Sequence, residues 1–151
     1  MVVKMIFRWL AFFGRLFMGG IFLYSSIPKI TDVVGFAAAI ENYRILPAFL
    51  IMPSAYIFIF SMLVIGIFLV LGFKTRFFSL LAIILVFVFT VALASSILRG
   101  LDIECGCFRD VPFRVKFAFF VDLAFLAILF GVFFTKDIPL SLDKLLLWIK
   151  K

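Results

Sequence analysis

Four long apolar stretches constrain this chain more than any other feature. They cover residues 7–26, 48–72, 77–98 and 117–134. A helix needs roughly 20 apolar residues to cross about 30 Å of hydrocarbon. Hydrophobic residues make up 67% of the chain and charged residues only 15%, and a soluble domain of 151 residues could not bury so much apolar surface. The sequence therefore predicts an integral membrane protein.

The predicted fold is all-α, an antiparallel bundle of four transmembrane helices that forms a single transmembrane domain over residues 1–151. The chain lacks the alternating apolar and polar segments of a membrane β-barrel. Arg15 interrupts the first apolar stretch, and no clear small-residue cleavage site follows it. We therefore expect the first helix to be retained rather than removed as a signal peptide.

Two further segments are expected to lie at the membrane surface. Residues 29–47 are too polar to cross, and Thr31 or Asp32 can cap a short helix that ends at Pro47. Val33, Phe36, Ile40 and Tyr43 would then share one face of this helix, over the outer mouth of the bundle. The tail, residues 139–151, combines a Leu, Trp and Ile face with terminal lysines, as an amphipathic interfacial anchor does.

The distribution of basic residues favours an orientation with both termini in the cytoplasm. In that orientation the cytoplasmic segments contain Lys4, Arg8, Lys74, Arg76, Lys136, Lys144, Lys150 and Lys151. The two outer loops contain Lys29, Arg44, Arg99, Arg109, Arg114 and Lys116. Because the basic residues lie beside the apolar stretches, we attribute the net charge of +7 to topology and lipid contact, not to nucleic-acid binding.

The chain contains no histidine, which excludes His-ligated haem, His-bound zinc and a Ser-His-Asp triad. Its two cysteines, Cys105 and Cys107, are too few for an iron–sulfur cluster on one chain. They form a Cys-Gly-Cys sequence in the segment that the orientation places outside the membrane, where thiols can be oxidised.

The Cys-Gly-Cys sequence has three interpretations. A three-residue disulfide ring stabilises by only about 1.6 kcal/mol before strain, so it is a poor structural staple and a better redox couple. Two thiolates also suit a soft cation such as Cu(I) or Hg(II). The third interpretation is a merely structural bridge, or two idle thiols. The redox interpretation is favoured.

The charges around the cysteines act in opposite directions. The positive N-terminal dipole of the fourth span favours a thiolate. Arg99, Arg109 and Arg114 add to that effect, whereas Asp102, Glu104 and Asp110 oppose it. Asp102 and Glu104 flank the cysteines and are supporting candidates for the site.

Two charges fall within the spans, Arg15 and Asp122. Intramembrane ions are costly and require partners. Their depths, counted at 1.5 Å per residue, differ by roughly 8–10 Å, which an arginine side chain nearly covers. The sequence therefore predicts an Arg15–Asp122 pair. Such a pair is either a buried lock between the first and fourth spans or a functional group in which Asp122 accepts a proton.

Lys29, Tyr43 and Arg44 form a third candidate group, at the outer mouth. They can pair with Asp122, line an aromatic and cationic pocket for a quinone ring or a partner, or anchor the chain at the lipid headgroups. Anchoring is favoured among these. Gly14, Gly19, Gly20, Ser25 and Ser26 are interpreted as small residues for close helix packing.

Several segments resemble the MauE/DoxX group of redox-associated membrane proteins. The resemblance is carried by RLFMGGIF at 15–22, SIPKI at 26–30, NYRILP at 42–47 and RGLDIECGCF at 99–108. It implies a four-helix bundle in a bacterial inner membrane. It also implies a periplasmic thioredoxin-like partner, as for MauE-type members, or quinone-linked electron transfer, as for the DoxX branch. The family often has glycine where this chain has Arg109-Asp110.

The predicted function is a membrane thiol–disulfide relay in which Cys105 and Cys107 are catalytic. They would exchange electrons between a periplasmic thioredoxin-like protein and a membrane acceptor, for which a quinone is the candidate. The supporting residues are Arg15, Lys29, Tyr43, Arg44, Asp102, Glu104 and Asp122. The alternatives are a soft-metal or thiol-ligand carrier that uses the same two cysteines, and a non-catalytic assembly subunit.

Overall fold

The computed structural model describes residues 2–100 and 115–135, which contain five helices and no strand. They are α1 (Val2–Thr31), α2 (Val33–Asn42), α3 (Ala48–Leu71), α4 (Thr75–Leu98) and α5 (Val115–Phe134). The predicted amphipathic tail at 139–151 and the cysteine segment lie outside the described residues.

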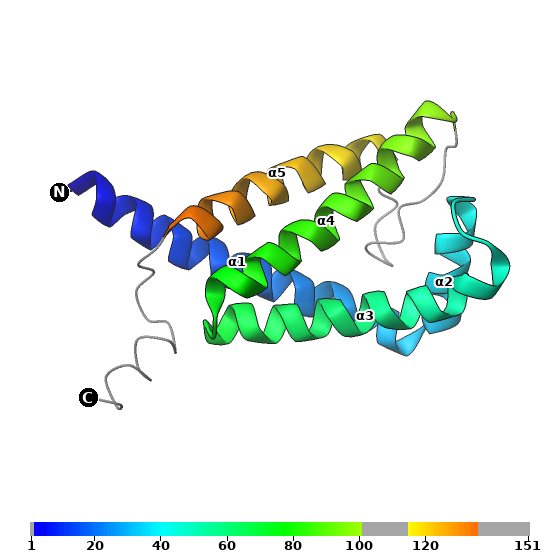
Figure 1. Ribbon diagram of the computed structural model, residues 1–151, viewed down its shortest axis with the longest axis horizontal. Helices are drawn as coiled ribbons and strands as arrows, with labels where there is room; N and C mark the ends of the chain where they lie inside the picture. The colour runs from blue at the N-terminus through cyan, green and yellow to red at the C-terminus, as the bar shows by residue number, and fades with distance from the viewer. Residues whose placement is uncertain (1, 101–114, 136–151) are drawn as a thin grey trace.

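The four long helices form a closed antiparallel bundle (Figure 1). Around the bundle, α1 packs on α3, α3 on α4, α4 on α5 and α5 back on α1. All four are long and apolar enough to cross a membrane. This arrangement confirms the predicted all-α fold with four transmembrane helices, and the four helices cover the predicted spans. That the chain is a single domain remains a prediction.

The two ends of the bundle differ. At one end, which we call the turn end, α3 and α4 are joined through Gly72–Lys74 and α1 begins (Figure 1). At the other, the α2 end, α1 runs into α2, which packs mainly on α3. This packing confirms the predicted short helix between the first two spans.

Local interactions explain the bounds of α2. The Asp32 side chain accepts a hydrogen bond from the Gly35 N–H, at 2.9 Å, and thereby caps the helix N-terminus. The helix ends at Asn42, before the predicted Pro47. Pro47 is instead the extended residue that precedes α3 (φ −67°, ψ 151°), a position that needs no N–H donor.

The turn end is closed by a left-handed residue. Gly72 has φ 72°, and the N–H groups of Gly72 and Phe73 both donate to the Phe68 carbonyl, at 2.9 and 3.2 Å. Glycine adopts this conformation without the penalty that a Cβ brings. The tight turn sets α4 antiparallel to α3.

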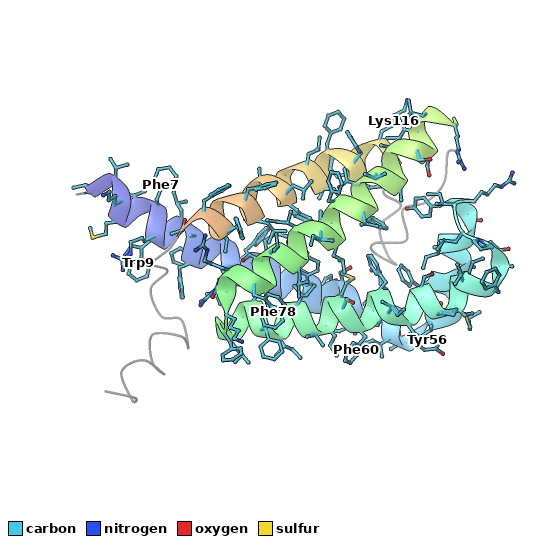
Figure 2. The ribbon with its side chains drawn as sticks, in the orientation of Figure 1. Phe7, Trp9, Tyr56, Phe60, Phe78 and Lys116 are labelled. Atoms are coloured by element: carbon cyan, nitrogen blue, oxygen red, sulfur yellow. The ribbon has the colours of Figure 1, made fainter. Side chains whose placement is uncertain are left out.

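Apolar packing fills the bundle from the turn end to its middle. Met18, Leu69, Ala82 and Leu129 are at most 1% exposed. Aromatic side chains such as Tyr56 and Phe60 on α3 point away from the bundle instead (Figure 2), as expected for side chains in contact with lipid.

Candidate functional site

The predicted catalytic residues, Cys105 and Cys107, lie outside the described residues, as do Asp102 and Glu104. The structure does describe the two helix ends that flank them. α4 ends at Leu98 and α5 begins at Val115, both at the α2 end (Figure 1). The described part of the site therefore consists of the helices that adjoin this segment.

A cavity of about 80 Å³ lies inside the bundle toward the α2 end. All four long helices line it, α3 with Phe58 and Met62 and α4 with Leu85, Val86 and Phe89. Most of the lining is aromatic or aliphatic. Its polar side chains come from α1 and α5: Ser25, Lys29 and Asp122.

Asp122 on α5 is 8% exposed, and its Oδ2 atom has no hydrogen-bond partner among the described residues. The carboxyl group is hydrogen-bonded to the side chain of Thr90 on α4. The Thr90 hydroxyl is also 2.8 Å from the Val86 carbonyl oxygen, one helical turn earlier. Thr90 is itself buried, so these contacts hold the carboxyl group of Asp122, a residue that lines the cavity.

Lys29 lies inside the bundle and not at the lipid headgroups, so the favoured prediction of interfacial anchoring is wrong for this residue. It is 4% exposed. Its ammonium donates to the carbonyl and to the hydroxyl of Ser25, at 2.9 and 2.8 Å, and lies 5.3 Å from the centre of the Phe36 ring. Because α1 continues to Thr31, the lysine leans back along its own helix and stays in the interior.

Tyr43 is also buried, at 4% exposure, which contradicts interfacial anchoring for this residue too. Its ring packs against Phe89, with centroids 6.1 Å apart, beside Leu93 and Ala118. Burial raises the pKa of the Tyr43 hydroxyl, and the nearby Asp122 carboxylate raises it further. Tyr43 therefore stays protonated near neutral pH.

Arg44 is the one member of this group that remains at the surface. It is exposed and has φ 50°, and its carbonyl oxygen accepts a hydrogen bond from Arg99 at 3.2 Å. This contact ties the end of α2 to the end of α4, next to the start of the cysteine segment. Anchoring at the headgroups remains a prediction for Arg44.

The predicted Arg15–Asp122 pair does not form. Gly14 lies opposite Ile128 and Val132, and Asp122 is six residues nearer the α2 end than Ile128, or about 9 Å along α5. Helical side chains lean toward the N-terminus of their helix, so in antiparallel helices Arg15 and Asp122 lean apart. Depth counting alone missed this divergence.

The guanidinium of Arg15 is 1% exposed and lies against Gly72, at the C-terminus of α3. It is also 5.3 Å from the centre of the Phe12 ring. The last carbonyls of a helix carry partial negative charge, which favours a cation there. Arg15 is therefore a structural element of the turn end, and the structure does not bring it to the cavity.

Sequence reasoning missed the parts played by Ser25 and Thr90. Ser25 was interpreted as a small packing residue, and Thr90 was not singled out. A hydroxyl residue within an apolar span was the available signal for Thr90. The packing interpretation holds for Gly14 and Gly19, which approach α5 and α3, but not for Gly20, whose hydrogen faces open space.

No cluster of three or more metal-ligating acidic, cysteine or histidine side chains occurs in the part of the chain that the structure describes. The arrangement there is thus a buried acid, a buried amine and a hydroxyl side chain that line a small cavity, with the Thr90 hydroxyl bonded to the acid. Side chains of these types can hold and exchange protons.

These features define the chain as a multi-pass membrane protein whose four-helix bundle contains a largely apolar cavity with three polar side chains in its lining. The family model described as "Methylamine utilisation protein MauE" matches residues 7–135. The chain belongs to this MauE family.

A curated relative supports the assignment. The "Methylamine utilization protein MauE" of Methylophilus methylotrophus is 28% identical over 134 residues, which cover 88% of this chain and 70% of the relative. No solved structure matches the chain.

Proposed function

We propose that this MauE-family protein is a thiol–disulfide relay in the bacterial inner membrane, with Cys105 and Cys107 as its redox pair. The observation that carries the proposal is the position of the Cys-Gly-Cys segment in the chain. It joins two helices, α4 and α5, whose ends lie at the α2 end, and Asp122 lines the cavity only seven residues into α5 from Val115. A disulfide that closes a ring of only three residues would suit exchange better than reinforcement.

The redox step of the cysteine pair is balanced in electrons and protons. Two thiols become one disulfide by losing two protons and two electrons, and the reverse step takes them up. A periplasmic thioredoxin-like protein would exchange with the pair through a mixed disulfide. Since the chain has one cysteine pair, the circuit needs a second acceptor or donor, and a membrane quinone takes up two electrons and two protons.

The name of the M. methylotrophus relative supports a role beside the enzymes of methylamine use.

In the proposed topology both termini are cytoplasmic and the cysteine segment faces the periplasm. Labelling Cys105 and Cys107 in intact cells with a membrane-impermeant maleimide, before and after reduction, tests this orientation. Labelling only after the cells are opened would contradict it.

Trapping a mixed disulfide tests the relay directly. Cys105→Ser and Cys107→Ser variants are expressed separately in native membranes, and disulfide-linked complexes are isolated under non-reducing conditions. We expect one of the two variants to accumulate a covalent complex with a thioredoxin-like protein. The double variant is the control and should capture nothing.

Two results would overturn the relay. In the first, neither single variant captures a partner. In the second, the double variant supports the partner pathway as well as the unaltered chain does. Protection of both thiols from labelling by Cu(I) or Hg(II), without redox cycling, would instead indicate a soft-metal carrier.

A further inference from the structure

The volume of the cavity near the α2 end limits which molecules can occupy it. At about 80 Å³ it is about half the roughly 150 Å³ of an apolar protein cavity that accommodates benzene. One water needs about 10–15 Å³ in such a measure, so the space suits several waters better than an organic ring. Water enters only where polar partners exist, and Ser25, Lys29 and Asp122 supply them.

The carboxyl group of Asp122 needs those waters. An ionised carboxylate offers about four acceptor positions, and the structure provides one side-chain partner, Thr90. Oδ2 has none among the described residues, although the residue is more than nine-tenths buried. A buried polar atom without a partner is costly, and because Asp122 lines the cavity, a small rotation of its carboxyl group would bring a water there within reach.

Thr90 makes the site sensitive to the protonation state. A hydroxyl group has a single proton to donate. The Thr90 oxygen lies 2.8 Å from the Val86 carbonyl oxygen and is also hydrogen-bonded to the Asp122 carboxyl group, so it can donate to only one of the two at a time. When Asp122 is ionised, the Thr90 hydroxyl must rotate and donate to the carboxylate instead. The two protonation states therefore differ by one hydroxyl rotation.

Among the described residues, few charged or titratable groups lie around Asp122. α1 contributes Lys29, the end of α2 contributes Tyr43, and α3 contributes only the apolar Phe58 and Met62 to the cavity. α4 contributes the Thr90 hydroxyl. Lys29 and Ser25 are hydrogen-bonded to each other, so a water beside them meets a donor and an acceptor on the α1 side.

We infer that this cavity is a water-filled proton-exchange site in which Asp122 takes up and releases a proton, with Thr90 as the rotating hydrogen-bond partner. The inference rests on the proposed relay for its role there. Oxidation of Cys105 and Cys107 breaks two S–H bonds and forms one S–S bond. The two electrons and two protons pass to the disulfide of the redox partner or to the membrane quinone. Asp122 holds one of the protons until the acceptor takes it, and the other passes to the acceptor directly.

Infrared spectroscopy tests the site without any redox chemistry. The full-length protein with Cys105→Ser and Cys107→Ser is placed in lipid nanodiscs and titrated in H₂O and D₂O. We expect a carboxylic-acid C=O band that titrates with pH, shifts in D₂O and is lost in Asp122→Asn. Thr90→Val should shift the band, because the carboxyl loses its partner, and Thr90→Ser should restore it.

Cavity filling tests the water. Ala118 lines the cavity, whereas Ala124 on the same helix is exposed, so Ala118→Val and Ala124→Val form a matched pair. Ala118→Val should slow D₂O exchange of the Asp122 band by about ten-fold or more, and Ala124→Val should leave it unchanged. Equal exchange in both variants, or no titrating band from Asp122, would overturn the inference.

The relay assay then separates the two proposals. With the cysteines present, Asp122→Asn should slow thiol oxidation by at least about ten-fold and change its pH profile, because general acid–base groups contribute about 10²-fold or more. An unchanged rate and pH profile would overturn the proton role. A titrating Asp122 band in a protein that never captures a redox partner would leave the water-filled site standing and overturn the relay.

Discussion

The two ends of the bundle handle buried charge in opposite ways. At the turn end, Arg15 is packed against Gly72 and the Phe12 ring, at the C-terminus of a helix. At the α2 end, Lys29 and Asp122 face a cavity, and one carboxylate oxygen lacks a partner among the described residues. Both ends bury ionisable side chains in the same apolar bundle, and the α2 end leaves room for water around them.

This contrast separates structural from functional charge. A buried cation at a helix C-terminus stabilises that terminus and fills space. A buried acid beside a cavity costs stability unless water or a proton satisfies it, and such groups cluster at functional sites. Substitutions at the turn end should therefore change mainly stability, and those at the α2 end mainly proton-dependent chemistry.

The largest expected effect is at Gly72. Alanine there must adopt φ 72°, and its Cβ would overlap the Arg15 guanidinium. We expect Gly72→Ala to lower the free energy of unfolding, measured by SDS titration in mixed micelles, by about 2–4 kcal/mol. Arg15→Met should relieve the overlap, so that Gly72→Ala costs only about 1 kcal/mol in that background.

Gly100 is the matched control for this prediction. It has φ 68°, and apart from its chain neighbours no atom of the described residues lies within 4 Å of the position where a Cβ would stand. Gly100→Ala should therefore cost only the backbone term, about 1 kcal/mol. Equal losses at Gly72 and Gly100 would show that Arg15 is not tightly packed at the turn end.

The second effect concerns the close contact of α1 and α3. A Cβ on Gly19 would stand 2.7 Å from Val70 Cγ2 and 3.1 Å from the Gly66 carbonyl oxygen, which is backbone and cannot turn away. We expect Gly19→Ala to cost about 1–3 kcal/mol in the same assay. Gly20→Ala, at a position facing open space, should instead gain about 0.5–1 kcal/mol from helix propensity.

Much of this architecture could be predicted from the sequence. Apolar stretches of bilayer length predicted the four long helices, and Asp32 and the apolar spacing after it predicted α2. The Arg15–Asp122 pair was predicted from depth and side-chain length, two quantities that ignore the direction in which helical side chains lean. A prediction that took this direction into account would have placed the Arg15 and Asp122 side chains toward opposite ends of the bundle.

The cavity could not be predicted in the same way. Its lining comes from four helices, and its volume depends on how their side chains interlock, which periodicity does not encode. Lys29 and Tyr43 were selected for their chemistry, but their burial depends on α1 continuing through Pro28 to Thr31 and on the packing of Tyr43 against Phe89.

The third prediction concerns Asp122 at the α2 end, where removing the charge should change the free energy of unfolding only slightly. Asparagine has nearly the same shape as Asp122, but it does not place a charge in the interior of the bundle. Asp122 is in no ion pair with the described residues and is bonded to the neutral Thr90, so the substitution leaves no opposite charge buried alone. We expect Asp122→Asn to change the free energy of unfolding by less than about 1 kcal/mol. A loss as large as that of Gly72→Ala would show that Asp122 is a structural lock like Arg15.

The smallest effect is a pH dependence from Tyr43. Burial and the Asp122 charge raise the pKa of its hydroxyl in the folded state, whereas an unfolded tyrosine ionises near pH 10, its ordinary value being about 10. Below about pH 10 both states keep the proton, so Tyr43 adds no pH dependence there. Above it the unfolded state releases the proton first, and stability falls as the pH rises, by roughly 0.4 kcal/mol between about pH 10 and 10.5. Tyr43→Phe should remove this part of the slope in SDS titrations at stepped pH. A slope that survives the substitution would assign the pH dependence to other groups and leave Tyr43 as a packing residue only.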